Sequence, residues 1–192
     1  DHSGDATRFI GKLTNVDRIK REKSRLIAQA QLDSLTGFYN KISTGLKINE
    51  IIQNKEDNKS CALFLIDVDN FKHVNDTYGH AEGDRFLVNV TSRLKLLFRS
   101  MDILGRVGGD EMVLFINDLT PELAEEKAKD ICKLFLDVRL EADESHRVSC
   151  SIGIAMWPDN GGSYTELFTR ADEAMYKAKT GGKNNYGFYG KD

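Results

Sequence analysis

Several features that define whole classes of protein are missing from this sequence. Its 192 residues hold no apolar run long enough to cross a bilayer, and we expect no signal peptide. The net charge is only −3, so the chain lacks the excess of Lys and Arg that charge-driven binding of nucleic acid requires. Its three cysteines, Cys61, Cys132 and Cys150, are odd in number and lie among apolar residues, which favours reduced core thiols over disulfides or a zinc site. We therefore expect a cytoplasmic fragment without nucleic-acid or membrane contacts, whose parent protein is free to be membrane-attached through other segments.

The length suits one good-sized domain with an N-terminal extension. Residues 9–17 are typical of a short strand and the turn that follows it. Residues 17–32 are charged and free of Gly and Pro, which predicts a helix with Asp17 at its N-cap. An unrelated surface helix and a frayed N-terminus would give the same pattern. We place the domain itself at 33–192.

Within the domain, helices and strands alternate. Apolar residues at helical spacing predict helices over 39–53, 83–99, 120–138 and 163–179. Apolar runs predict strands over 61–68, 147–155 and 186–189, with a hairpin over 103–116. An antiparallel hairpin combined with crossover helices indicates an α+β fold with helices packed against a sheet.

The tip of the predicted hairpin reads Gly108-Gly109-Asp110-Glu111. Glycine lets the backbone approach a ligand closely because it has no Cβ and tolerates positive φ. Two carboxylates beside such a turn are typical of a site for phosphate and a divalent cation. An ordinary solvated turn has the same composition, so this segment alone does not distinguish a binding site from a surface turn.

A second acidic segment follows the apolar run 61–66. Asp67 and Asp69 are two apart and so share one face of a strand. Carboxylates at the end of a buried strand are costly unless their charge is balanced, and Mg²⁺ supplies that balance with one or two carboxylates, water and substrate phosphates. Capping of the next helix is the alternative for these acids, and for Asp69 and Asp76 we favour capping or surface hydration.

Four segments together resemble the GGDEF domains, which are diguanylate cyclases. Residues 108–112 are similar to the motif that names the family, with Met112 in place of the final Phe. Residues 67–84, which include Asp-Val-Asp-Asn-Phe-Lys and Gly-His, resemble the second block of the family. The opening block resembles 33–41 and the closing block resembles 171–184, in the order of the family. The resemblance implies the palm-like fold of nucleotidyl cyclases, with a central, mostly antiparallel sheet flanked by helices and preceded by a signalling helix.

The resemblance also assigns metal and catalytic roles. Asp67, the Val68 carbonyl and Asp110 would hold Mg²⁺ or Mn²⁺. Glu111 would help to hold a second ion or take the proton of a ribose 3′-hydroxyl. Such a pair of ions stabilises the attacking and leaving oxygens of an in-line displacement.

Phosphates need cations and backbone N–H donors. The backbone from Asn70 through Phe71 to Lys72 is expected to cradle the β- and γ-phosphates, with the glycine turn of Gly108 and Gly109 nearby. Lys72, which we also assign to catalysis, would supply positive charge, as would Lys179 and Lys183 from the closing block. The family often has Arg where Lys183 stands, and Lys loses the bidentate geometry.

Guanine presents two adjacent donors that a carboxylate such as Asp84 accepts, and Asn75 can read the neighbouring edge. The resemblance implies these guanine roles for Asn75 and Asp84, and we place His80 near the same pocket. Adenine lacks these donors and would leave a buried carboxylate unpaired, so such a pocket would strongly disfavour ATP. Arg99 and Asp102 resemble the RxxD site at which the product binds and inhibits; a helix-terminal Arg beside an Asp cap is the alternative.

The leading hypothesis is an enzyme that condenses two GTP into cyclic di-GMP with release of two pyrophosphates. One GTP per domain implies a catalytic homodimer, and residues 1–32, which resemble the end of a PAS sensor domain and its signalling helix, would set its geometry. A catalytically inactive module that binds cyclic di-GMP or GTP is the second hypothesis. A cyclase or polymerase-like enzyme for another nucleotide is the third, and Asn75 with Asp84 argues against it.

Overall fold

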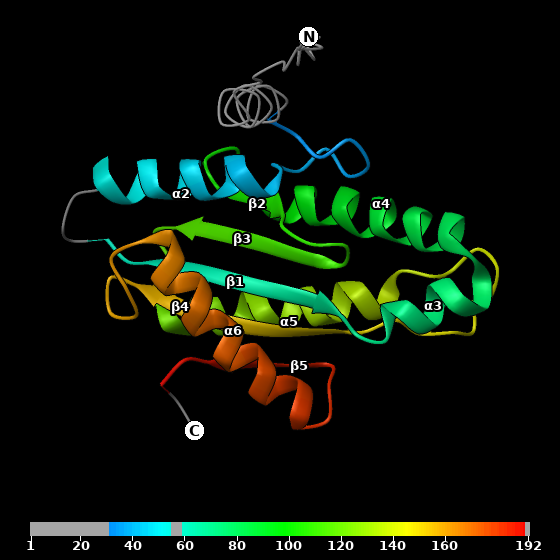
Figure 1. Ribbon diagram of the computed structural model, residues 1–192. Coiled ribbons are helices and arrows are strands. Elements are labelled where there is room, and N and C mark those ends of the chain that lie inside the picture. The colour runs from blue at the N-terminus through cyan, green and yellow to red at the C-terminus, as the bar shows by residue number, and fades with distance from the viewer. Residues whose placement is uncertain (1–30, 55–58, 191–192) are drawn as a thin grey trace, which may run out of the picture. The chain divides into compact units, whose positions relative to one another are not determined.

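A computed structural model describes residues 31–54 and 59–190 (Figure 1). The predicted strand over 9–17 and almost all of the predicted helix over 17–32 lie outside the described residues, and so does the predicted sensor-domain remnant. The division into 1–32 and 33–192 stays a prediction. In the described part of the chain, no helix is long and apolar enough to cross a membrane.

Five strands form one mixed sheet in the order β2-β3-β1-β4-β5. Its strands are β1 (Cys61–Val68), β2 (Ile103–Arg106), β3 (Glu111–Asn117), β4 (Cys150–Trp157) and β5 (Asn185–Phe188). All neighbouring strands are antiparallel except β4 and β5, which are parallel. The predicted, mostly antiparallel sheet is confirmed.

Helices cover both faces of this sheet (Figure 1). One face packs against α2 (Lys41–Asn54) and α6 (Tyr164–Thr180), and the other against α4 (His80–Leu97) and α5 (Pro121–Asp137). A short helix, α3 (Phe71–Tyr78), follows β1 directly and packs against α4. The predicted α+β class with helices on a central sheet is therefore confirmed.

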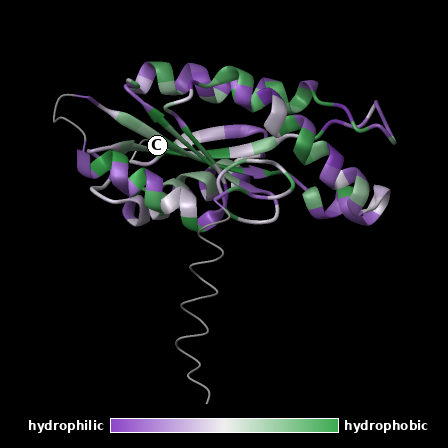
Figure 2. Cartoon of the chain, turned by 90° about the horizontal axis from the view of Figure 1, so that it is seen from above, coloured by the Kyte–Doolittle hydropathy of each residue, from purple (hydrophilic) through white to green (hydrophobic). Residues whose placement is uncertain are grey.

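The central strand β1 is buried on both faces, which explains its uninterrupted apolar run. Phe64 and Ile66 point to the core under α4 and α5, whereas Leu63 and Leu65 point to the core under α2 and α6. Figure 2 shows hydrophobic stretches of strand between helices in which hydrophobic and hydrophilic residues alternate. Because side chains alternate along a strand, Asp67 continues the Leu63 and Leu65 row and faces the α6 side.

The structure corrects some predicted boundaries. The helix predicted over 83–99 begins at His80, and the helix over 71–78 was not predicted. Only Phe71 and Val74 of α3 are buried, too few to produce a clear helical period. Gly79, with φ 86°, separates the two helices, a conformation that favours glycine. The remaining elements differ from prediction by a few residues at their ends, which is the usual uncertainty of such boundaries.

Candidate functional site

The two acidic segments meet at one end of the sheet. Asp67, near the end of β1, pairs in register with Glu111, the first residue of β3. The Val68 N–H donates to the Asp110 carbonyl oxygen at 3.4 Å. Paired residues of an antiparallel ladder project to the same face, so the Asp67 and Glu111 side chains share the α6 side. A strand end and a turn that are distant in sequence thus bring their acids together.

Burial and the neighbouring negative charges both disfavour the ionised forms of Asp67 and Glu111. Burial raises the pKa of Asp67, and the charges of Asp110 and Asp69 add to the rise. Lys179, whose Nζ lies 2.9 Å from Asp67 Oδ2, opposes this rise without cancelling it. Burial also raises the pKa of Glu111, followed by the charges of Asp67 and Asp110. A cation bound here would relieve this mutual repulsion.

The acids suit Mg²⁺ better than a metal held by protein alone. Among residues 31–54 and 59–190, no group of three or more Asp, Glu, His or Cys is arranged to enclose a metal. Mg²⁺ is usually bound through one or two carboxylates, with water and substrate phosphates completing its shell. Asp67, Asp110 and the Val68 carbonyl fit that requirement. They are the groups that would hold the ion.

Hydrogen bonds from Arg106 fix the glycine turn, while the space that a side chain at Gly109 would take is unoccupied by other described residues. Arg106 donates to the Gly109 carbonyl oxygen through Nε at 3.1 Å and Nη2 at 2.7 Å. The Glu111 side chain folds over Gly108, where an added Cβ would lie 2.5 Å from Glu111 Oε2. Around Gly109 an added Cβ would meet nothing within 4 Å. Met112 is fully buried, as expected for a residue that takes the place of Phe.

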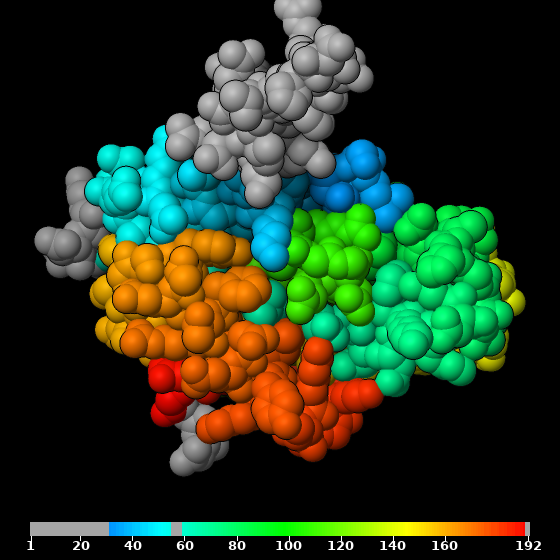
Figure 3. All heavy atoms as spheres, viewed as in Figure 1, coloured from blue at the N-terminus to red at the C-terminus, as the bar shows by residue number. Residues whose placement is uncertain are grey.

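The predicted phosphate-binding residues lie beside the acids. Asn70 adopts a left-handed conformation, φ 58°, and is the N-cap residue of α3. Lys183 Nζ donates to Asn70 Oδ1 at 2.7 Å, and the Lys72 side chain is exposed in the first turn of α3. The Phe71 side chain is buried in the core, so this residue has only its backbone to offer a phosphate. In Figure 3, α6 (orange) and the β2–β3 region (green) occupy the same face of the domain.

The predicted guanine-reading residues lie where α3 packs on α4. An added Cβ at Gly83 would overlap Asn75 Oδ1, so the two residues are in close contact. Asp84 follows Gly83 along α4 and is exposed, as is His80 one turn earlier. Gly83 therefore contacts Asn75 and directly precedes Asp84, while His80 is the first residue of the same helix.

Comparison with known proteins now decides the family. Residues 30–185 match the family model of the diguanylate cyclase, GGDEF domain. This chain belongs to the GGDEF family.

Curated relatives and solved structures agree with the assignment. The bifunctional diguanylate cyclase/cyclic di-GMP phosphodiesterase MucR of Pseudomonas aeruginosa is 39% identical over 181 residues, which cover 92% of this chain and 25% of MucR. The cyclic di-GMP phosphodiesterase PdeR of Escherichia coli is 34% identical over 189 residues, 96% of this chain and 28% of PdeR. A structure of the GGDEF domain of TpbB from Pseudomonas aeruginosa has a TM-score of 0.77 at 31% identity, covering 82% of this chain and 94% of that domain.

The chain spans about a quarter of the length of MucR and PdeR, at 25% and 28%. One of these relatives is named for synthesis and breakdown of cyclic di-GMP, the other for breakdown alone. Membership of the GGDEF family therefore does not by itself decide what a given domain does. What this GGDEF domain does depends on the side chains of its site.

The predicted product-binding residues line a different part of this GGDEF domain. Asp102 is buried; its carboxylate accepts from the Arg99 N–H at 2.9 Å and from the Asn117 N–H at 3.1 Å. Arg99 and Asp102 border a cavity of about 420 Å³. The other residues that line it are Leu32, Gly37, Phe38, Tyr39, Lys95, Phe98, Ser100 and Leu104. None of them belongs to the carboxylate cluster.

Two residues near the site were not predicted. Arg106 immediately precedes the glycine turn, and that position in the sequence was the available signal. Asp69 was expected to be a cap or a hydrated surface residue, but it is buried and accepts three hydrogen bonds. Nothing in the sequence near Asp69 names those partners, because they lie 80 or more positions away.

Proposed function

We propose that this GGDEF domain is a diguanylate cyclase that condenses two GTP molecules into cyclic di-GMP and two pyrophosphates. The observation that carries the proposal is the pairing of Asp67 with Glu111 beside Asp110. An acidic cluster next to lysines and an open glycine turn is suited to a nucleoside triphosphate with its cation.

Each group has a role in that reaction. Asn75 and Asp84 read guanine, and the backbone of 70–72 with Lys72, Lys179 and Lys183 binds the triphosphate. Mg²⁺ or Mn²⁺ held by Asp67, Asp110 and the Val68 carbonyl would neutralise charge on the phosphates.

Glu111 has the chemistry of a general base. Burial among neighbouring acids raises its pKa, which brings its basicity closer to that needed at neutral pH. The ribose 3′-oxygen loses its proton to Glu111 and attacks the α-phosphorus of the facing GTP. The bond from that phosphorus to the bridging oxygen breaks, and pyrophosphate leaves. The same exchange in the opposite direction closes the ring, so two domains with one GTP each form the active homodimer.

We also assign product feedback to Arg99 and Asp102. An arginine stacks on guanine and pairs with phosphate, and the adjoining cavity offers room for part of the product. In support, the report of a solved structure 28% identical to this chain describes an interaction between a microbial GGDEF domain and cyclic di-GMP.

The second candidate is a domain that binds cyclic di-GMP or GTP without catalysis. The 34% identity to PdeR, which is named a phosphodiesterase, favours it, as does Lys183 where the family often has Arg. The acids Asp67, Asp110 and Glu111 are all retained in this chain, which favours the cyclase.

One experiment separates the two candidates. The purified chain is incubated with GTP and Mg²⁺, and cyclic di-GMP is detected by mass spectrometry, with ATP as the control nucleotide. We expect product from GTP only, and none from Asp110→Asn or Glu111→Gln variants whose melting temperatures match the parent. A dimeric chain that binds cyclic di-GMP but makes none would establish the binding module instead. The oligomeric state is measured in the same samples, since catalysis requires two domains.

A further inference from the structure

Asp69 is a buried carboxylate that directly follows the proposed metal ligands Asp67 and Val68 but is not one of them. It is 5% exposed. Its Oδ2 accepts from Ser149 Oγ at 2.6 Å and from the Asn184 N–H at 3.0 Å, and its Oδ1 accepts from Ser151 Oγ at 2.7 Å. The Asp69 N–H donates to the Ser149 carbonyl oxygen at 2.9 Å. A buried charge with this many donors is held by the protein and holds its partners in turn.

One of those partners belongs to a strained segment. After α6 the chain passes through Gly182 with φ 123°, Lys183 with φ 63° and Asn184 with φ 46°. Two successive non-glycine residues in the left-handed region cost free energy and persist only where other contacts enforce them. The bond from the Asn184 N–H to Asp69 is such a contact.

A second contact joins the same two segments. Lys183 donates to the side chain of Asn70, which is itself left-handed with φ 58°. Asp69 and Asn70 are neighbours at the end of β1, and Lys183 and Asn184 are neighbours after α6. The two strained segments are therefore fastened by two adjacent bonds, one of them to a buried charge.

We propose that Asp69 is a positioning residue that holds Lys183 in place for the triphosphate of GTP. This inference rests on the proposed function. Asp69 itself touches no substrate and acts through the backbone of Asn184. The neutral Asn70 amide orients the Lys183 ammonium without neutralising it, so its positive charge stays available to a phosphate oxygen. Without Asp69, the segment relaxes out of the left-handed region and Lys183 loses its orientation.

The test is a double-mutant cycle on nucleotide binding. The probe is guanosine 5′-(α,β-methylene)triphosphate with Mg²⁺, which cannot release pyrophosphate, and its affinity is measured by calorimetry. Asp69→Ala is expected to weaken binding about tenfold, because a charge-assisted hydrogen bond is lost. Lys183→Ala is expected to weaken it to a similar extent. The double variant is expected to bind no more weakly than Lys183→Ala alone.

Asp69→Asn is the conservative companion and serves if the alanine variant does not fold. Its amide oxygen still accepts from the Asn184 N–H, so we expect roughly a two- to threefold loss of affinity, since only the charge contribution disappears. In turnover assays KM for GTP should rise more than kcat falls. Thr120→Ala, which removes the side-chain cap of α5, is the control for general destabilisation and should leave affinity at the parental value.

The outcomes are distinct. Additive losses in the double variant, or parental affinity in both Asp69 variants, would overturn the positioning role. A parent chain that binds the analogue but makes no cyclic di-GMP from GTP would overturn the proposed cyclase activity. The double-mutant cycle on analogue binding would then still test the positioning role of Asp69. A parent chain that binds no guanine nucleotide would overturn both.

Discussion

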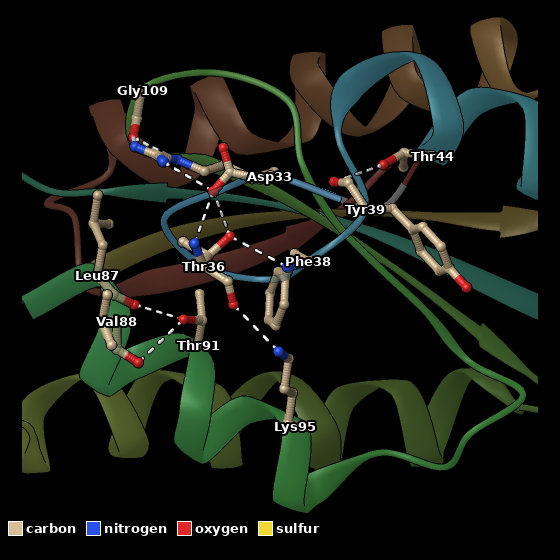
Figure 4. Close-up of polar contacts among 11 residues, drawn as sticks. Asp33, Thr36, Phe38, Tyr39, Thr44, Leu87, Val88, Thr91, Lys95 and Gly109 are labelled. Carbon is tan, nitrogen blue, oxygen red and sulfur yellow. Dashed lines mark hydrogen bonds and ion pairs between the residues drawn. The ribbon is translucent and has the colours of Figure 1, made fainter. Parts of the chain in front are cut away.

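The carboxylate of Asp33 lies 3.1 Å from the guanidinium of Arg106, although 73 positions separate the two residues. Asp33 also accepts from the Thr36 N–H at 2.9 Å and from Thr36 Oγ1 at 2.7 Å (Figure 4). Burial would raise the pKa of Asp33, but the Thr36 bonds and Arg106 outweigh it and lower the pKa. Since Arg106 also holds the Gly109 carbonyl, the segment before α2 is connected to the turn that carries Asp110.

Arg106→Lys should therefore impair catalysis more than stability. Lysine keeps the charge but lacks the planar fork by which Arg106 donates to Gly109 through Nε and Nη2 and to Asp33 through Nη1, so the turn loses its fixed position. We expect kcat to fall on the order of tenfold to a hundredfold, because small misplacements of catalytic groups are costly. Steady-state rates and melting temperatures measure the two effects separately.

Asp33→Asn is the matched partner. Its amide oxygen still accepts from Thr36, while the ion pair with Arg106 is lost, so we expect a smaller fall in kcat in the same direction. In the double variant with Arg106→Lys, Asp33→Asn should lower kcat little further. Parental turnover of Arg106→Lys would refute the proposed connection.

Glu82 makes the domain sensitive to acid. Its buried carboxylate ion-pairs with Arg85 and accepts from the Glu141 N–H at 2.6 Å and the Ala142 N–H at 3.3 Å. Burial would raise the pKa of Glu82, but the Arg85 bond and the two backbone donors outweigh it and lower the pKa. Folding therefore disfavours protonation of Glu82. The resulting stabilisation is present above the unfolded pKa of about 4.3 and is lost as the pH falls through the lower folded pKa.

Glu82→Gln should remove that stabilisation. We expect the free energy of unfolding at pH 7 to fall by about 2 kcal/mol, since hydrogen bonds to a buried charge are lost. Urea unfolding at pH 7 and at pH 4 should show the parent losing more of its stability toward acid than the variant. Glu141→Gln, whose exposed side chain also reaches Arg85, is the control and should stay within about 0.5 kcal/mol of the parent. Equal acid sensitivity of Glu82→Gln and the parent would count against this role.

The acid cluster could be predicted because its parts are local. Asp67 ends an apolar strand and Asp110 sits in a glycine turn, and each is recognisable within a few residues. Asp69 and Arg106 have partners far along the chain, at Asn184 and Asp33, which no local pattern identifies. The α+β fold class followed from the predicted antiparallel hairpin and crossover helices.

Helix α3 was missed for a related reason. Its polar sequence buries only Phe71 and Val74, so its helical period is weak, and its stability comes from packing on α4. Tertiary contacts determine whether such a segment forms a helix, and its own eight residues do not reveal those contacts.

Arg99 is the better probe of product feedback than Asp102. Asp102 is buried and accepts two backbone N–H groups, so its removal would disturb the chain around it. Arg99 is exposed at the mouth of the cavity. Arg99→Ala is expected to raise the inhibition constant of added cyclic di-GMP roughly tenfold, through loss of a charge-assisted contact. Arg93→Ala, an exposed position on α4 that does not line this cavity, should keep the parental inhibition constant.

Gly83 offers a test of guanine recognition in which neither Asn75 nor Asp84 is itself substituted. A methyl group there would overlap Asn75 Oδ1 and approach the Phe71 ring to 3.0 Å. Alanine also raises helix propensity by about 1 kcal/mol, so we expect Gly83→Ala to keep the parental melting temperature. The displaced Asn75 amide no longer meets the base, so KM for GTP should rise roughly tenfold and the preference for GTP over ATP should shrink.

Asn75→Ala supplies the control for that mechanism. If Gly83→Ala acts by displacing Asn75, then adding it to Asn75→Ala changes KM for GTP no further, because the displaced group is already absent. An additional rise in the double variant would mean that the methyl group obstructs the base itself. Parental KM in Gly83→Ala would instead show that Asn75 does not read guanine, since its side chain must move to admit the methyl group.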